Sequence, residues 1–147
     1  MRSRGFTILE LLVVITIIGV TTAFAFPKLK DSINHEATRN ARREFTSQLS
    51  RARATAIQRG CRATLQIRAA AQRLYIETCK LTGAGLDTLK PQSYLGANYG
   101  VTMTSGADSI PFAPTSLGLA ASTVALTFVK GGYTSSLSVS AIGRASW

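Results

Sequence analysis

A continuous apolar run near the N-terminus constrains this sequence more than any other feature. From Phe6 to Phe26 the chain has 21 residues and one charged side chain, Glu10. As an α-helix the run is roughly 31 Å long, which matches the hydrocarbon core of a bilayer. A helix buried in a soluble core is the alternative, but such helices rarely run so long without a polar face. We therefore predict that this apolar segment, residues 6–26, spans a membrane.

The carboxylate of Glu10 bears on what the apolar segment does. A secretory signal peptide is one interpretation, with the sequence AFA at 23–25 as its cleavage site, and a plain membrane anchor is another. A third is a helix that is retained after a short basic leader has been removed. A carboxylate in hydrocarbon costs a few kcal/mol, and a disposable signal peptide has no use for it. Glu10 therefore favours the retained helix.

Two roles for Glu10 remain open, and they are compatible with each other. Thr7 and Glu10 have the spacing of a capping box, so the carboxylate can satisfy a free amide at the helix start. Cleavage after Gly5 leaves a positive amine on Phe6. Glu10 can then neutralise that amine, within one chain or between packed helices. Both roles need Glu10 close to the new terminus.

The stretch RGFTILELLVVITIIGVTTAFAFP resembles the N-terminus of type IV pilins and type II secretion pseudopilins. It has Gly5, Phe6, Glu10, Gly19 and Pro27 at the spacing of that family. The resemblance implies that a prepilin peptidase removes the leader, residues 1–5, and that Phe6 is then N-methylated. It also implies a single-pass protein of the inner membrane, with its head in the periplasm, before assembly into a filament with other pilins or pseudopilins. Glu10, Gly19 and Pro27 would serve in that assembly.

Beyond Pro27 the pattern changes to that of an amphipathic helix. Proline cannot continue the amide ladder and is expected to kink the helix. Gly60 supplies a stop signal, so we predict an amphipathic helix of the head over residues 27–60. Its apolar stripe comprises Leu29, Ile33, Ala37, Ala41, Phe45, Leu49, Ala52 and Ala56.

The remaining residues, 61–147, predict an antiparallel β head domain. Alternating or apolar runs bounded by glycine and polar residues predict strands, and Gly131-Gly132 predicts a turn between the last two. The stretch 82–97 contains Gly, Pro and Asn and predicts a loop. The fold class is therefore α+β, with one long N-terminal helix packed against an antiparallel sheet. The predicted strands lie at 61–67, 74–79, 101–104, 124–129 and 136–143.

Parts of the head narrow the resemblance further. The sequence SRARATAIQRG at the helix end, IPF at 110–112 and LSVSAIGR ending at Arg144 resemble the GspH/FimT family of minor pseudopilins and minor pilins. Some FimT-like minor pilins bind DNA during uptake through a C-terminal Gly-Arg-x-Arg element. This chain has Gly143 and Arg144 but Ser146 in place of the second arginine. This departure from the element weakens the inference that Arg144 binds DNA.

The two cysteines, Cys61 and Cys79, leave a choice of register in the first predicted hairpin. A disulfide between them would stabilise the fold by about 3 kcal/mol in an oxidising compartment. Pairing the cysteines also pairs Leu65 with Tyr75. Pairing Leu65 with Ile76 packs a better apolar face but puts the cysteines on opposite faces unless a bulge intervenes. A disulfide and two buried free thiols both remain open.

The net charge is +10, which favours acidic partners. Nine arginines lie between Arg39 and Arg73. Four of them share an arc of the predicted helix away from the apolar stripe, and we call them the arginine face. A solvated face, or contact with acidic neighbours in a filament, is the simpler interpretation; binding of DNA phosphates is the sharper one. The arginine face comprises Arg39, Arg42, Arg43 and Arg53.

The sequence offers nothing for catalysis. His35 is its one histidine, and there is no nucleophile with a base, no metal-ligand cluster and no phosphate-binding loop. We therefore expect no cofactor, no metal and no enzyme activity. The sequence predicts a minor pilin or pseudopilin, a structural subunit of a type II secretion pseudopilus or type IV pilus. The alternative is a DNA-binding minor pilin that serves DNA uptake in natural transformation.

Overall fold

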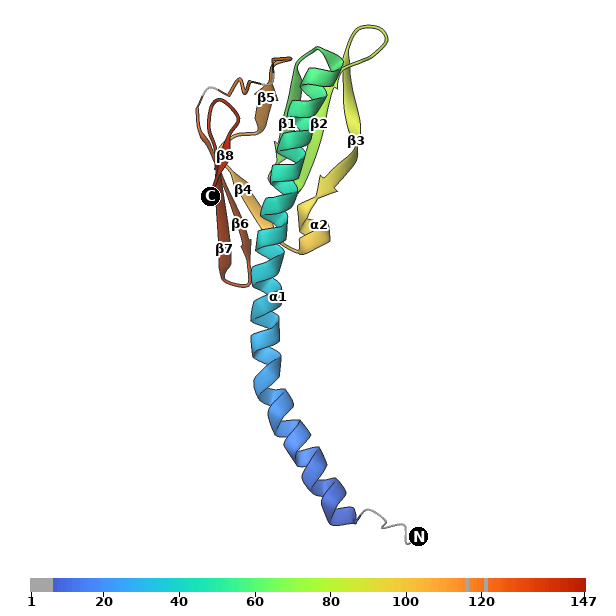
Figure 1. The fold of residues 1–147 in the computed structure, drawn as a ribbon, viewed down its shortest axis with the longest axis vertical. Coiled ribbons are helices and arrows are strands. Elements are labelled where there is room, and N and C mark those ends of the chain that lie inside the picture. Colours follow the sequence, from blue (N-terminus) through green and yellow to red (C-terminus); the bar gives the residue numbers. More distant parts are fainter. Residues whose placement is uncertain (1–6, 116, 121) are drawn as a thin grey trace. The chain divides into compact units, whose positions relative to one another are not determined.

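The computed structural model describes residues 7–115, 117–120 and 122–147. The chain divides into two compact units, one ending at Ile33 and one running from Asn34 to Trp147. We call the second unit the head. A single helix, α1 (Ile8–Arg59), begins in the first unit and ends in the head, and it passes through Pro27 without a break (Figure 1). The helix ends where predicted, and the Gly60 amide donates to the Ile57 carbonyl.

Within the head, one face of α1 is buried at intervals of three or four residues. This burial confirms the predicted stripe from Ala37 to Ala56. The prediction is wrong for the first two members of the stripe, Leu29 and Ile33. Leu29 and Ile33 are 58% and 55% exposed and belong to the first unit, in which every described residue is exposed. Periodicity reports the spacing of apolar residues but not where the packing partner ends. The buried positions are Ala37, Thr38, Ala41, Phe45, Gln48, Leu49, Ala52, Thr55 and Ala56.

The head contains two four-stranded antiparallel sheets. The α+β class with an antiparallel arrangement is confirmed, although the strands form two sheets rather than one. The first sheet has the order β3-β2-β1-β5, and the second has the order β4-β6-β7-β8. The first sheet comprises β1 (Ala63–Arg68), β2 (Arg73–Cys79), β3 (Leu86–Tyr94) and β5 (Ser109–Phe112). The second comprises β4 (Thr102–Ser105), β6 (Val124–Lys130), β7 (Tyr133–Val139) and β8 (Ala145–Ser146).

The loop predicted for residues 82–97 is wrong. Most of this stretch is strand β3, and its end begins the short helix α2 (Leu95–Tyr99). β3 pairs with β2 at the edge of its sheet. Pro91 lies between Leu89 and Ser93, where the register with β2 shifts, and such an irregularity on an edge strand tolerates proline. The pairing with β2 thus overrides a local composition that is typical of loops.

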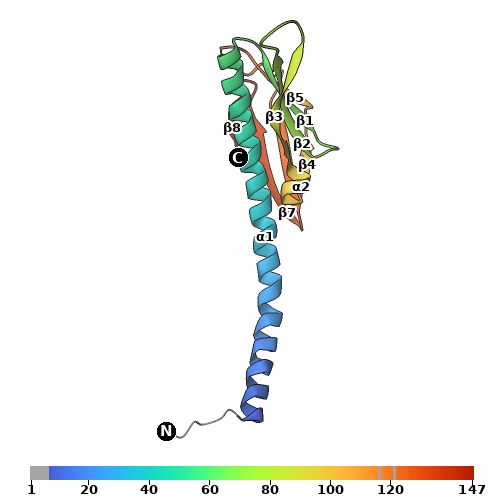
Figure 2. The same cartoon turned by 90° about the vertical axis from the view of Figure 1, so that its right-hand side faces the viewer.

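Both sheets bury side chains against the head's part of α1. Figure 2 shows this part of the helix as a separate layer alongside the strands. At its centre the rings of Phe45, on α1, and Phe128, on β6, lie 6.1 Å apart between centroids, and both are fully buried. β6 and β7 are joined through Gly131 and Gly132, whose φ angles of 55° and 86° suit the two-residue hairpin turn predicted there.

Candidate functional site on the apolar helix and the arginine face

The first part of α1 is exposed along its whole described length. An 18-residue window of the helix has a mean hydropathy of 2.4, and none of that window is buried. By length and composition the helix can cross a membrane. Nothing in the first unit covers its side chains, so about half of the surface of Ile15, Ile17 and Ile18 is exposed (53%, 57% and 58%). This part of α1 presents an apolar surface that water does not stabilise.

The threonines of the apolar segment bond to their own helix. The Thr16 hydroxyl donates to the Val13 carbonyl at 2.8 Å, and the Thr22 hydroxyl donates to the Ile18 carbonyl at 2.7 Å. Thr21 donates in the same way to Ile17 at 2.9 Å. These hydroxyls therefore need no partner outside the helix, which lowers the cost of placing them in hydrocarbon.

The structure shows a cap at the start of α1. The Glu10 amide donates to the Thr7 hydroxyl at 3.2 Å, which is one half of the capping box expected from the sequence. Gly5 and Phe6, the predicted cleavage and methylation positions, lie outside the described residues. Gly19 and Pro27 lie on the exposed part of α1, and a Cβ added at Gly19 would meet no atom within 4 Å.

The structure joins Cys61 and Cys79 in a disulfide, with Cα atoms 6.4 Å apart. The hairpin nevertheless takes the apolar register, with Leu65 opposite Ile76. The conflict expected from the sequence assumed that Cys61 lies in the strand. β1 begins only at Ala63, so Cys61 precedes the ladder and reaches Cys79 without a bulge in this hairpin.

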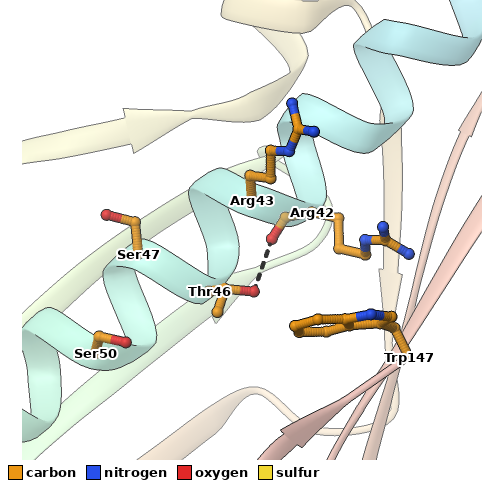
Figure 3. Close-up of a pocket in the computed structure, with 6 residues that line it drawn as sticks. All are labelled: Arg42, Arg43, Thr46, Ser47, Ser50 and Trp147. Atoms are coloured by element: carbon orange, nitrogen blue, oxygen red, sulfur yellow. Dashed lines mark hydrogen bonds between the residues drawn. The ribbon is translucent and has the colours of Figure 1, made fainter.

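The arginine face divides into different environments. Arg39 is exposed. The Arg42 guanidinium lies 5.5 Å from the centroid of the Trp147 ring, as Figure 3 shows. Arg43 forms an ion pair of 3.2 Å with Glu36, and both side chains are largely exposed. Arg42 and Arg53 are half-buried, so the predicted solvated face is wrong for these two arginines.

Arg53 holds the loop after β7. Its Nη2 donates to the Gly143 carbonyl at 2.6 Å, and its guanidinium lies 5.4 Å from the centroid of the Phe112 ring. Gly143 is buried, with a φ of 81°, and a Cβ there would come within 2.5 Å of Phe112. The next residue, Arg144, is exposed. This contact was not predictable from the sequence, because 90 residues separate Arg53 from Gly143.

Other arginines join α1 to the first sheet and were not singled out from the sequence. Arg51 donates to the carbonyls of Lys90 and Pro91 at 2.6 and 3.3 Å. Arg59 donates to the Cys79 carbonyl at 2.7 Å and pairs with Asp87 at 3.2 Å. Much of the positive charge on this helix therefore has a structural role. The one feature of the sequence that could have indicated these contacts is the arginine that recurs every few residues at the end of α1.

The remaining sequence candidates have packing roles. His35 lies edge-on to Tyr133, with ring centroids 5.6 Å apart. In the described ranges no group of three or more His, Cys, Asp or Glu side chains is placed to hold a metal ion.

A hydrogen bond from Arg68 to the Tyr75 hydroxyl raises the pKa of the Arg68 guanidinium, which leaves it charged at physiological pH.

Comparison with known proteins agrees with this arrangement. The family model for the prokaryotic N-terminal methylation motif matches residues 1–26. The chain thus has the N-terminal methylation motif of prokaryotic pilin-like proteins. The fold of this pilin-like chain resembles the type IV minor pilin FimU of Pseudomonas aeruginosa PAO1, with a TM-score of 0.58 and 15% identity over 74% of this chain and 86% of FimU. It also resembles the minor pseudopilin EpsH from the type 2 secretion system of Vibrio cholerae, with a TM-score of 0.57 and 13% identity over 74% of this chain and 94% of EpsH.

No curated protein sequence shows significant similarity to the pilin-like chain. The solved proteins that share this fold are a minor pilin and a minor pseudopilin. The motif and the apolar segment that it contains are consistent with an anchor in the inner membrane.

Proposed function

We propose that this chain is a minor subunit of a type IV pilus or a type II secretion pseudopilus, of the GspH/FimT kind. The observation that carries the proposal is the continuity of α1. One helix joins an exposed apolar segment, which lies within a methylation motif, to the core of a head with the fold of FimU and EpsH. A helix of this kind can be stored in lipid and later packed among the helices of a filament with other pilins.

The first test is the chemical identity of the mature N-terminus. Processing by a prepilin peptidase removes residues 1–5, so mass spectrometry should find an N-methylated Phe6. Gly5 has no side chain and fits a narrow cleavage site, so Gly5→Leu should leave the leader attached. A mature N-terminus at Phe26 would establish a secretory signal peptide ending in AFA and would reject the proposal.

The second test separates the two roles of Glu10. Glu10→Gln keeps the capacity to cap the helix but removes the charge that neutralises the Phe6 amine. We expect Glu10→Gln and Glu10→Ala to be cleaved and to reach the inner membrane, yet to enter filaments poorly. Glu36→Ala, which removes an exposed carboxylate of the head, is the matched control. Normal incorporation of Glu10→Gln would reduce the role of Glu10 to capping.

DNA binding is the second candidate, and one observation favours it. Arg144 is exposed on a closed turn, in which the Ser140 amide donates to the Arg144 carbonyl at 2.9 Å. We propose that any DNA contact of the head centres on Arg144. Arg144→Ala should then weaken duplex binding more than Arg39→Ala, which removes an exposed arginine of α1. Equal losses, with normal transformation in a deletion strain, would leave only the structural role.

A further inference from the structure

A hollow of about 500 Å³ lies between α1 and the end of β8 in the head. Figure 3 shows its lining, which comes from one side of α1 and from a single residue beyond β8. β8 pairs with β7, with Ala145 opposite Val139, and this pairing places Trp147 across from the helix. The lining residues are Arg42, Arg43, Thr46, Ser47, Ser50 and Trp147.

Arg42 is the cation that faces Trp147. In Figure 3 its side chain extends over the indole, whereas Arg43 leaves the helix in another direction. Arg43 is already engaged, because it donates to Glu36 at 3.2 Å and to Asn40 at 3.1 Å. In residues 7–115, 117–120 and 122–147 the guanidinium of Arg42 has no carboxylate partner and no hydrogen-bond acceptor. Its contact with the indole, 5.5 Å from the centroid, leaves the fork of N–H donors free.

The rest of the hollow suits a group that brings both a negative charge and carbon atoms. Trp147 is 78% exposed, so its ring offers an open apolar surface beside the cation. Ser47 and Ser50 are exposed, and their hydroxyls make no hydrogen bond within the described part of the chain. A planar oxyanion can take two parallel hydrogen bonds from Arg42, while its methylene groups pack on the indole.

We propose that this hollow binds a glutamate or aspartate side chain in an acidic segment of a partner protein. The net charge of the chain supports the choice of an acidic partner, since the chain carries 17 Lys and Arg against 7 Asp and Glu. The number of free groups supports a peptide over a nucleic acid. One unpaired guanidinium and one aromatic ring match a single carboxylate. Single-stranded DNA or RNA is instead bound by a row of aromatic side chains and cations. The proposal is independent of the machine that the chain serves.

The chain carries its own reporter for this site, because Trp147 is its only tryptophan. The full chain in a non-ionic detergent is titrated with an oligo-glutamate peptide while Trp147 emission is recorded. An oligo-glutamine peptide of equal length and free acetate are the controls for charge and for the peptide context. We expect a saturable change in emission with oligo-glutamate, a much weaker one with acetate, and none with oligo-glutamine.

Variants assign the binding to Arg42. Arg42→Gln should weaken oligo-glutamate binding about tenfold or more, because it removes a charge-assisted pair of hydrogen bonds. Arg42→Lys keeps the charge without the planar fork and should fall between Arg42→Gln and the parent chain. Arg39→Gln, which removes an exposed arginine outside the hollow, should change binding by no more than about twofold. Circular dichroism checks that each variant keeps the fold.

Three results would overturn the proposal. One is an equal loss of binding in Arg39→Gln and Arg42→Gln, because the head would then attract anions only through its overall charge. Another is that oligothymidylate, followed by Trp147 emission, binds with higher affinity than oligo-glutamate and that this binding depends on Arg42. That result would assign the hollow to nucleic acid. The third is a response to oligo-glutamine equal to that to oligo-glutamate.

Discussion

The two parts of α1 have the same secondary structure and opposite surroundings. Up to Ile33 every described residue is exposed, and the stretch from Leu11 to Phe26 is apolar apart from three threonines. From Asn34 onward one face is buried, and Phe45 at its centre has no exposed surface. The more apolar part is thus the one without a core. The comparison teaches that the apolar content of a helix does not tell whether its partner is the chain itself or something outside it, such as lipid or other helices.

The largest expected effect tests this contrast directly. Phe45→Ala should destabilise the head by about 3 to 5 kcal/mol, because it leaves a cavity beside Phe128. Ile15→Ala removes a similarly apolar group from the exposed part of α1 and should change the unfolding of the head by less than about 0.5 kcal/mol. Urea unfolding of the full chain in detergent, followed by Trp147 emission, measures both. Similar losses for the two variants would break the comparison.

The disulfide should have the second largest effect, confined to the head. The bond closes a loop with a sequence separation of 18. In the chain-entropy account, a double Cys61→Ala and Cys79→Ala variant therefore loses about 3 kcal/mol of stability. Circular dichroism should show an unchanged helix in the exposed part of α1. A double variant as stable as the parent would show that the bond does not restrain the unfolded head.

Two glycines sharpen the comparison further. Gly143 has a φ of 81°, and an added Cβ would meet Phe112, so Gly143→Ala should cost about 2 kcal/mol or more. Gly19→Ala meets no neighbour within 4 Å and should leave the unfolding of the head unchanged. Thermal unfolding compares the two variants. An unaffected melting temperature in Gly143→Ala would mean that the loop after β7 shifts without loss of packing.

The smallest expected effect concerns a surface ion pair. Arg43 and Glu36 are 3.2 Å apart, with side chains 67% and 49% exposed. Arg43→Ala should therefore change the stability of the head by no more than about 0.5 kcal/mol, and salt should reduce the difference further. Urea unfolding at low and high salt measures it. A loss comparable with that of Gly143→Ala would contradict this view of the exposed side of α1.

Local patterns predicted most of the elements. The end of α1 at Arg59, the first hairpin and the turn at Gly131-Gly132 follow from periodicity, glycine and alternation. Edge strand β3 was missed because its composition is that of a loop, and only its pairing with β2 makes it a strand. The division into two sheets was missed for the same reason, since the partners of a strand are not written in its own residues.

The candidate sites show the same limit. The cap between Thr7 and Glu10 is a short-range contact and was predictable from spacing alone. Helical geometry groups the four arginines on one arc, but it does not reveal that Arg53 bonds to Gly143 or that Arg42 lies over Trp147. Both contacts join residues that are far apart in the chain. Sequence spacing on a helix gives the direction of a side chain relative to its neighbours, and it cannot say what stands opposite.

The internal hydrogen bonds of Thr16, Thr21 and Thr22 have a consequence for how α1 changes surroundings. Each of these hydroxyls carries its acceptor with it, one turn back along the same helix. A helix that moves from lipid into contact with other helices therefore exchanges only dispersion contacts at these positions. None of these three donors has to find a new acceptor during the transfer, so the threonine hydroxyls neither favour nor oppose either side of the exchange.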